Sequence, residues 1–399
     1  MKKFSILFLL CALFPFYASA QQNLFAAQDI TSAEVDDNHC VTFRFIAPNA
    51  KKVQVAGDFL EKAEKNPVGG IVGTGLADMV KDTAGVWTYT SKPLPSELYS
   101  YLIVVDGVPT TDPNNVYVYR DFATVSNVFI VGGGKADLYK VNAVPHGTVE
   151  ARWYHSDAFG YDRRLNVYTP AGYEDHLDRK YPVLYLLHGS GGDENEWVTF
   201  GRAIQILDNL IAQGKAVPMI VAMPNGHPAM EAAPGESSWG YYKPYHVKSL
   251  GPNAFENAFP EIMNFVESNY RVQADKAHRA IAGLSMGGGH SLKISMMYPD
   301  KFDYVGLFSA AYGYRFGEKT QPADPFAPIR DQLKEQFRQG VKLYWIGCGN
   351  QDFLFPNVTA YRHELDNDGF KYTYMETGDG HVWKNWRIYL QNYLPLLFR

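Results

Sequence analysis

From residue 145 onward, short apolar runs alternate with longer stretches of helical periodicity, and this pattern constrains the fold most. The apolar runs cover residues 165–168, 183–187, 219–223, 280–282, 304–308 and 343–347. The helical patterns between them include residues 203–213, 257–269 and 331–339. Strands that are apolar throughout, rather than at every second residue, suit a sheet covered on both faces. Residues 145–399 are therefore predicted to form an α/β domain with a mostly parallel central sheet.

The preceding part of the chain has a different period. Residues 41–45, 53–55 and 87–89 alternate between apolar and polar side chains, and Asp106-Gly107 is a hairpin-type turn signal. Residues 21–131 are predicted to form a small all-β, immunoglobulin-like sandwich. Three consecutive glycines then break the pattern, and residues 132–144 are expected to be a linker.

The first twenty residues have the organisation of a secretory signal peptide. Lys2 and Lys3 precede an apolar run over residues 4–16, and Ala18-Ser19-Ala20 supplies small residues for cleavage. The apolar run is too short for a permanent membrane span. The mature chain is therefore expected to be periplasmic or secreted.

Composition excludes several function classes. The chain has 37 basic and 42 acidic residues and a net charge of -5, which gives no electrostatic footprint for nucleic acid or a membrane surface. No clustered His/Cys ligand set and no phosphate-cradling loop is present, so neither a metal nor an organic cofactor is expected. Cys40 and Cys348 fall in different predicted domains and are expected to be free, buried thiols.

Gly283-Leu284-Ser285-Met286-Gly287 is the motif that most directly indicates chemistry. It follows the apolar strand 280–282 and leads into a helical stretch. A serine on a tight strand-to-helix turn needs small neighbours two residues away, and this is the context of a nucleophile elbow. Ser285 is therefore the predicted nucleophile.

A serine hydroxyl needs a base, and His381 is the histidine predicted to supply it. It lies in a loop after the strand-like residues 372–375 and before a helical pattern, late in the chain. His39 belongs to the β domain, and His290 lies on the helix after the elbow, where packing accounts for it.

Asp352 is predicted to orient the imidazole. It directly follows the strand 343–347, at the sheet edge where open α/β sheets bind ligands. Asp366 and Asp368 compete, although a solvated helix end accounts for them. The order Ser285, Asp352, His381 is that of the α/β-hydrolases.

The oxyanion hole is predicted to consist of two backbone N–H groups, those of Ser190 and Met286. Ser190 belongs to His188-Gly189-Ser190-Gly191-Gly192, which follows the buried strand 183–187. Met286 follows the nucleophile. His188 is expected to have a structural role.

Residues 146–399 resemble the esterase D-like branch of the α/β-hydrolases, and most closely the feruloyl and acetylxylan esterases of carbohydrate esterase family one. The resemblance rests on residues 181–189, 283–288, 348–352 and 380–386. It implies an α/β-hydrolase fold and the same serine, aspartate and histidine as the triad.

The first domain resembles early-set β-sandwiches related to carbohydrate-binding module family forty-eight. The matching segments are residues 53–59, 85–87, 99–101, 105–107 and 112–113. Those modules usually carry a tryptophan soon after the equivalent of Gly57-Asp58-Phe59, whereas Leu60-Glu61-Lys62 follows here. Sugar binding and a purely structural role both stay open for this domain.

Aromatic residues in the loop 231–243 give the clue to substrate. Trp239, Tyr241 and Tyr242 are candidates for contact with a planar hydroxycinnamoyl group or a sugar face, with ordinary loop packing as the alternative. Trp383 and Trp386 are expected to be core contacts of the last helix.

The leading hypothesis is a serine esterase that hydrolyses feruloyl esters on plant cell-wall arabinoxylan through an acyl-enzyme. Its partner would be that polysaccharide or a small ester. Acetylxylan esterase and siderophore esterase are alternatives within the enzyme class. A non-catalytic carbohydrate-binding protein is the alternative of another class.

Overall fold

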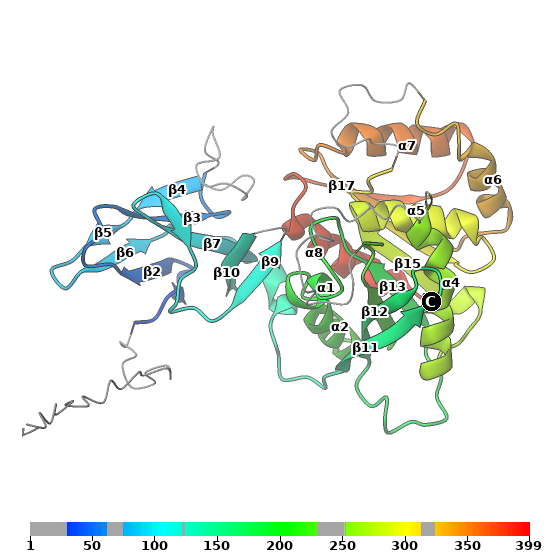
Figure 1. Ribbon diagram of the computed structural model, residues 1–399, viewed down its shortest axis with the longest axis horizontal. Helices are drawn as coiled ribbons and strands as arrows, with labels where there is room; N and C mark the ends of the chain where they lie inside the picture. Colours follow the sequence, from blue (N-terminus) through cyan, green and yellow to red (C-terminus); the bar gives the residue numbers. More distant parts are fainter. Residues whose placement is uncertain (1–29, 62–74, 122–123, 230–250, 252, 313–323) are drawn as a thin grey trace, which may run out of the picture.

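The computed structural model describes residues 30–61, 75–121, 124–229, 251, 253–312 and 324–399, which form a β-sandwich followed by a larger α/β domain (Figure 1). Within these ranges, no helix is both long and apolar enough to cross a bilayer. Residues 1–20, predicted to be a signal peptide, lie outside the described residues.

The first domain consists of two antiparallel sheets, in agreement with the all-β prediction. Their strand orders are β1-β2-β6-β5 and β4-β3-β7-β10-β9, with β8 paired to β7. Phe43, Tyr101 and Phe129 pack at the centre of the core between them. The strands are β1 Glu34–Val35, β2 Val41–Ile46, β3 Val53–Gly57, β4 Gly75–Asp78, β5 Val80–Lys81, β6 Val86–Thr90, β7 Glu97–Val105, β8 Val108–Thr110, β9 Val118–Asp121 and β10 Thr124–Val131.

The second domain is built on an eight-stranded sheet of order β11-β12-β14-β13-β15-β16-β17-β18. From β14 to β18 every neighbouring pair is parallel, whereas β12 is antiparallel to both β11 and β14. The mostly parallel sheet is confirmed. The strands are β11 Thr148–Ser156, β12 Tyr161–Thr169, β13 Val183–Leu187, β14 Ile220–Pro224, β15 Arg279–Leu284, β16 Tyr304–Phe308, β17 Leu343–Gly349 and β18 Thr373–Thr377.

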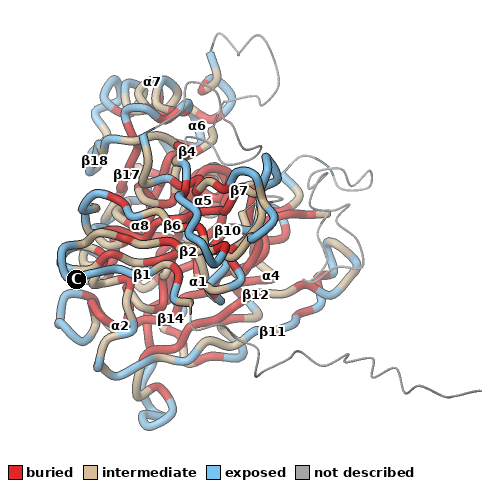
Figure 2. Tube along the Cα trace, turned by 90° about the vertical axis from the view of Figure 1, so that its left-hand side faces the viewer, coloured by how far each residue is buried: buried red, intermediate tan, exposed pale blue. Residues whose placement is uncertain are grey.

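Helices cover both faces of this sheet, which explains why its central strands are apolar throughout. Helices α4, α5, α6 and α7 pack on one face together with Val183, Tyr185 and Leu187 of β13. Helices α1, α2 and α8 pack on the other face with Leu184 and Leu186. Figure 2 shows the buried residues gathered in the interior of the molecule and the exposed residues in its outer turns. The helices are α1 Glu196–Thr199, α2 Ala203–Ala212, α4 Ala254–Asn269, α5 Met286–Met297, α6 Arg330–Arg338, α7 Phe355–Asn367 and α8 Trp383–Tyr393, with short 3-10 helices η1 Lys135–Tyr139, η2 Lys276–His278 and η3 Leu394–Leu396.

One hydrophobic cluster spans both domains. Leu98 and Val128 of the sandwich belong to the cluster formed by α2 and α8. The segment 132–144, expected as a linker, contains η1, whose Ala136 and Tyr139 are fully buried in that cluster. This segment is therefore packed against the α/β domain and is not a free tether.

A buried ion pair also crosses this junction. Arg387 of α8 lies 3.1 Å from the Glu97 carboxylate, and both side chains are almost fully buried. The same guanidinium donates to the carbonyl oxygens of Leu98 and Phe200. Strands β9 and β10 lie beside α1 and α8 as a result (Figure 1).

Cys40 and Cys348, the cysteines in the described residues, are unpaired, as predicted. Cys348 is buried at the end of β17, but Cys40 is only partly buried, and the expectation of two buried thiols was wrong for Cys40. Cys40 follows the turn at His39, just before β2 begins.

Candidate active site

Ser285 lies on a strained turn between β15 and α5. Its φ is 51° and its ψ is -115°, a conformation that costs a non-glycine residue free energy and is common at functional sites. A Cβ on Gly287 would lie 2.4 Å from the Leu187 carbonyl oxygen, and one on Gly283 would lie 2.5 Å from the Gly287 backbone. The two motif glycines are thus required by backbone contact, as the elbow prediction assumed.

Backbone hydrogen bonds hold the strained residue. The Ser285 N–H donates to the Phe308 carbonyl at 2.9 Å, and the Ala311 N–H donates to the Ser285 carbonyl at 2.9 Å. Met286 is the first residue of α5, where N–H groups have no partner within the helix. The donor predicted from Met286 therefore lies at a helix N-terminus, next to the serine.

His381 and Asp352 are in direct contact. Nδ1 of His381 lies 3.0 and 2.8 Å from the two carboxylate oxygens of Asp352. The Asp352 side chain is fully buried, and that of His381 is 18% exposed. Asp352 Oδ1 also accepts the Leu354 N–H at 2.9 Å, which fixes the carboxylate at the start of α7. Because Nδ1 is hydrogen-bonded to a carboxylate, Nε2 is the ring nitrogen available to accept a proton from a hydroxyl, as a general base requires.

The imidazole of His381 is held between two rings. Its centroid lies 4.6 Å from that of Phe353 and 4.9 Å from that of Trp386. Asn385, almost fully buried, donates to the carbonyls of Gly378 and Gly380 at 2.9 Å each and so shapes the loop that carries His381. The sequence analysis assigned Asn385 no role. The feature that could have indicated one is its place in residues 380–386, a segment that carries the family resemblance.

The strand order brings Ser285 to the same edge of the sheet. Leu284 pairs with Phe308, Phe308 with Gly347, and Gly349 with Thr377, so the segments after β15, β16, β17 and β18 meet there. Ser309, which follows Phe308, accepts the Trp386 indole N–H at 3.3 Å. Trp386 in turn packs edge-on against His381.

Within the described residues, no hydrogen bond joins the Ser285 hydroxyl to His381. Catalytic hydrogen bonds of this kind commonly tighten only when substrate binds. The geometry thus unites Asp352 with His381 and places Ser285 at their edge of the sheet.

The loop predicted to supply the second oxyanion donor lies against the nucleophile. A Cβ on Gly189 would lie 3.4 Å from the Ser285 Cβ. The Gly192 N–H donates to the Gly189 carbonyl at 3.1 Å, so Ser190 lies inside a tight turn. The hydrogen bond that closes this turn does not involve the Ser190 N–H. Gly189 therefore lies against Ser285, and the N–H groups of Ser190 and Met286 stay the predicted oxyanion donors.

His188 anchors this loop, as its expected structural role requires. Its Nε2 accepts the Gly226 N–H at 2.8 Å, and its Nδ1 lies 2.7 Å from the Gly189 carbonyl oxygen. Burial lowers the pKa of His188 to about 4, so the ring is neutral near pH 7.

Two further reactive groups near the elbow are packed. His290 is buried on α5, with Nδ1 2.9 Å from Glu256, which agrees with the packing expected for it. Burial opposes the charge of Glu256, but His290 and Lys293 lower its pKa to about 2. Burial and the nearby Asp352 raise the pKa of the Cys348 thiol to about 12, so it is not a nucleophile at neutral pH.

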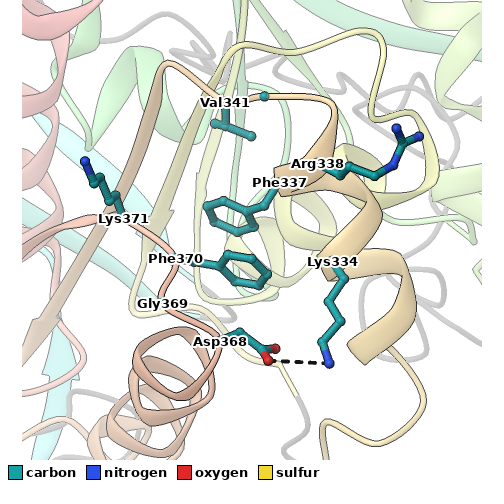
Figure 3. Close-up of a pocket in the computed structure, with 9 residues that line it drawn as sticks. Lys334, Phe337, Arg338, Val341, Asp368, Gly369, Phe370 and Lys371 are labelled. Carbon is teal, nitrogen blue, oxygen red and sulfur yellow. Dashed lines mark ion pairs between the residues drawn. The ribbon is translucent and has the colours of Figure 1, made fainter.

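Asp366 and Asp368, the competitors of Asp352, lie at the end of α7. Asp368 pairs with Lys334 at 3.4 Å on the rim of a hollow that Phe337 and Phe370 line (Figure 3). Val341 and Lys371 of this hollow precede β17 and β18, at the opposite edge of the sheet from Ser285. Neither aspartate reaches the candidate site.

The remaining site predictions concern aromatic residues. Trp239, Tyr241 and Tyr242 all lie in the segment 230–250, outside the described residues. Trp383 and Trp386 are buried in the core, as expected. Among the residues that the structure describes, no group of three or more His, Cys, Asp or Glu side chains could hold a metal ion.

Comparison with known proteins gives a consistent result. The model of the Esterase family matches residues 156–397. The endo-1,4-beta-xylanase/feruloyl esterase of Xylanibacter ruminicola is 30% identical over 370 residues, which is 90% of this chain and 44% of that protein. The chain thus spans less than half the length of this curated relative.

Solved structures agree in fold. The carbohydrate esterase family one ferulic acid esterase of Anaeromyces mucronatus, also solved in complex with ferulic acid, is 26% identical with a TM-score of 0.52, over 65% of this chain and 93% of that chain. The enterobactin esterase of Shigella flexneri covers 89% of this chain and 92% of that chain with a TM-score of 0.61. At 15% identity, the latter similarity concerns the fold alone.

Proposed function

The chain belongs to the Esterase family, and on that basis we propose that it is a serine esterase that cleaves feruloyl esters of plant cell-wall arabinoxylan. Ser285 is the proposed nucleophile, His381 the base and Asp352 the residue that orients it. The oxyanion donors are the N–H groups of Ser190 and Met286. No cofactor takes part in this scheme.

In the first half of the reaction, Ser285 Oγ attacks the ester carbonyl while His381 Nε2 accepts its proton. The negative charge of the tetrahedral intermediate falls on the carbonyl oxygen, where the two N–H groups stabilise it. The intermediate collapses, His381 returns the proton to the sugar oxygen, and the alcohol leaves. An acyl-enzyme on Ser285 remains.

Water completes the cycle. His381 removes a proton from a water molecule that attacks the acyl carbonyl. When the second tetrahedral intermediate collapses, His381 gives that proton to Ser285 Oγ, and the acid departs. Asp352 keeps its charge throughout and stabilises the imidazolium that forms in each half.

One observation carries the proposal: Nδ1 of His381 lies within hydrogen-bond distance of both oxygens of the buried Asp352, at the sheet edge where the Ser285 turn has a φ of 51°. A buried charge needs a partner, and Asp352 has the Nδ1 atom of His381. A strained serine at the same sheet edge as a histidine–carboxylate pair is what nucleophilic catalysis requires.

Two relatives support the hydroxycinnamoyl group. The Xylanibacter protein is named for xylanase and feruloyl esterase activities, and the Anaeromyces enzyme was solved with ferulic acid. Trp239, Tyr241 and Tyr242 are proposed to contact this planar acyl group. The signal-peptide pattern of residues 1–20 supports export to the periplasm or medium, where such a polysaccharide would be met.

An ester panel tests the proposed substrate. Methyl ferulate, feruloylated arabinoxylan, acetylated xylan and a catechol siderophore ester are incubated with the full chain, and products are separated by chromatography. We expect release of ferulate to have the highest kcat/KM. Dominant release of acetate, or cleavage of the siderophore alone, would replace feruloyl esterase by the corresponding alternative. No turnover of any ester would favour a carbohydrate-binding protein.

A further inference from the structure

The β-sandwich reaches the loop that borders the nucleophile. Arg120, on strand β9, lies 2.5 Å from the Asp193 carboxylate, 73 residues away in the chain. Asp193 belongs to the loop after β13 that also contains Ser190. Its side chain is only 9% exposed.

The strand that carries Arg120 is itself fixed to the α/β domain. The ring of Tyr119 packs against Phe200 with centroids 5.4 Å apart, and its hydroxyl accepts from Arg202 at 3.1 Å. Phe200 and Arg202 connect α1 to α2. Because neighbouring side chains on a strand point to opposite faces, Tyr119 anchors the strand while Arg120 points to the loop.

The loop has an excess of buried acidic groups. Asp193, Glu194 and Glu196 are all less than one-tenth exposed. Burial raises the pKa of Glu194, and the Asp193 charge raises it further. Burial also raises the pKa of Glu196 well above its usual range, with contributions from Asp121 and Asp193. Two arginines oppose these charges: Arg120 pairs with Asp193 and also lowers the pKa of Glu196, and Arg164 lies 3.7 Å from the Glu194 carboxylate.

Asp193 is held to the residues that follow it through both its side chain and its backbone. Its carboxylate accepts the Asn195 N–H at 2.8 Å, and its carbonyl accepts the Glu196 N–H at 3.2 Å. It directly follows the Gly189–Gly192 turn, which contains Ser190 and lies against Ser285. A displaced Asp193 would therefore displace the turn.

We propose that Arg120 is a positioning residue for the oxyanion loop, residues 189–193. The β-sandwich, which carries Arg120, would then contribute to catalysis and would not be only a neighbouring module. This inference rests on the proposed esterase function, in which the Ser190 N–H stabilises the oxyanion. Arg120 acts through Asp193: it neutralises a carboxylate that the loop buries, and without it the loop shifts to hydrate that charge.

The kinetic test compares Arg120→Ala and Arg120→Lys with the full-length wild type on methyl ferulate. We expect Arg120→Ala to lower kcat at least about tenfold, because a misplaced oxyanion donor costs transition-state stabilisation, with KM within about twofold. Arg120→Lys, which keeps the charge, is expected to recover part of kcat. Thermal unfolding shows whether each variant is folded at the assay temperature.

Asp193→Asn supplies the decisive comparison. The amide keeps an oxygen for the Asn195 N–H but carries no charge that needs a partner. In the Arg120→Ala background, Asp193→Asn is therefore expected to restore most of kcat, which a general loss of domain contact could not do. Arg44→Ala is the matched control, since Arg44 forms an exposed ion pair with Glu34 within the sandwich and should leave kcat unchanged.

Amide hydrogen exchange of the peptide covering residues 188–197 separates this inference from the proposed function. Faster exchange in Arg120→Ala, reversed by Asp193→Asn, supports loop positioning whatever the catalytic activity. Wild-type kcat in Arg120→Ala, or unchanged exchange in this peptide, overturns it. A wild type that hydrolyses no ester counts against the proposed function instead.

Discussion

At the scale of single residues, the site depends on how His381 is oriented. Asp352 holds Nδ1 from one side, while Phe353 and Trp386 fix the plane of the ring. Asn385 shapes the loop backbone through two carbonyl groups. Each contact restricts the imidazole to the orientation in which Nε2 is available to a hydroxyl. Asp352 is the one charged residue among these contacts.

Asp352→Asn tests this orientation directly. The amide can hydrogen-bond to the wrong tautomer of His381 and cannot stabilise the imidazolium, so we expect kcat to fall by about 10³–10⁴ with little change in KM. Asp366→Asn, at the end of α7, is the matched control and should retain wild-type kcat on methyl ferulate. Loss of activity in Asp366→Asn together with near-normal activity in Asp352→Asn would contradict the assignment.

At the scale of elements, the site is built where parallel strands end. The strand ends were predictable because β13, β15, β16 and β17 are buried on both faces and therefore apolar throughout. β11 carried no such signal. It is an edge strand with exposed residues such as Trp153 and His155, so its sequence has no continuous apolar run.

Gly287→Ala tests the elbow as an element. The added methyl group would lie 2.4 Å from the Leu187 carbonyl oxygen, so β13 and the start of α5 must move apart. We expect a loss of kcat of at least about tenfold, since Ser285 and the Met286 N–H move together, and a lower melting temperature. Wild-type kinetics in a folded Gly287→Ala variant would show that the close approach is not needed.

At the scale of the whole molecule, the sandwich and the α/β domain are joined by a hydrophobic cluster and a buried ion pair. Leu98, Val128 and Tyr139 fill the same core as α2 and α8, and Glu97 pairs with the buried Arg387. The sequence predicted the two domain types and the three residues of the candidate triad. The packing of the two domains against each other could not be predicted from the sequence. Contacts such as that between Glu97 and Arg387 join residues 290 positions apart and leave no local pattern.

Glu97→Ala is expected to destabilise the whole chain. It leaves the Arg387 guanidinium buried without its carboxylate, which costs about 3–5 kcal/mol of unfolding free energy. Adding Arg387→Met removes the unpaired charge and should recover much of that loss. Glu34→Ala, which removes an exposed partner, should change the free energy of unfolding by less than about 1 kcal/mol. Equal effects of Glu97→Ala and Glu34→Ala in denaturant titrations would contradict a shared core.

Ser285 is tested as the nucleophile by the mass of the protein quenched during turnover of a 4-nitrophenyl ester. We expect a burst of nitrophenol and one acyl group on the peptide that contains Ser285, with both absent from Ser285→Ala, which should fold like the wild type. An acyl group on another residue, or undiminished turnover by Ser285→Ala, would contradict the proposal that this strained serine is the nucleophile.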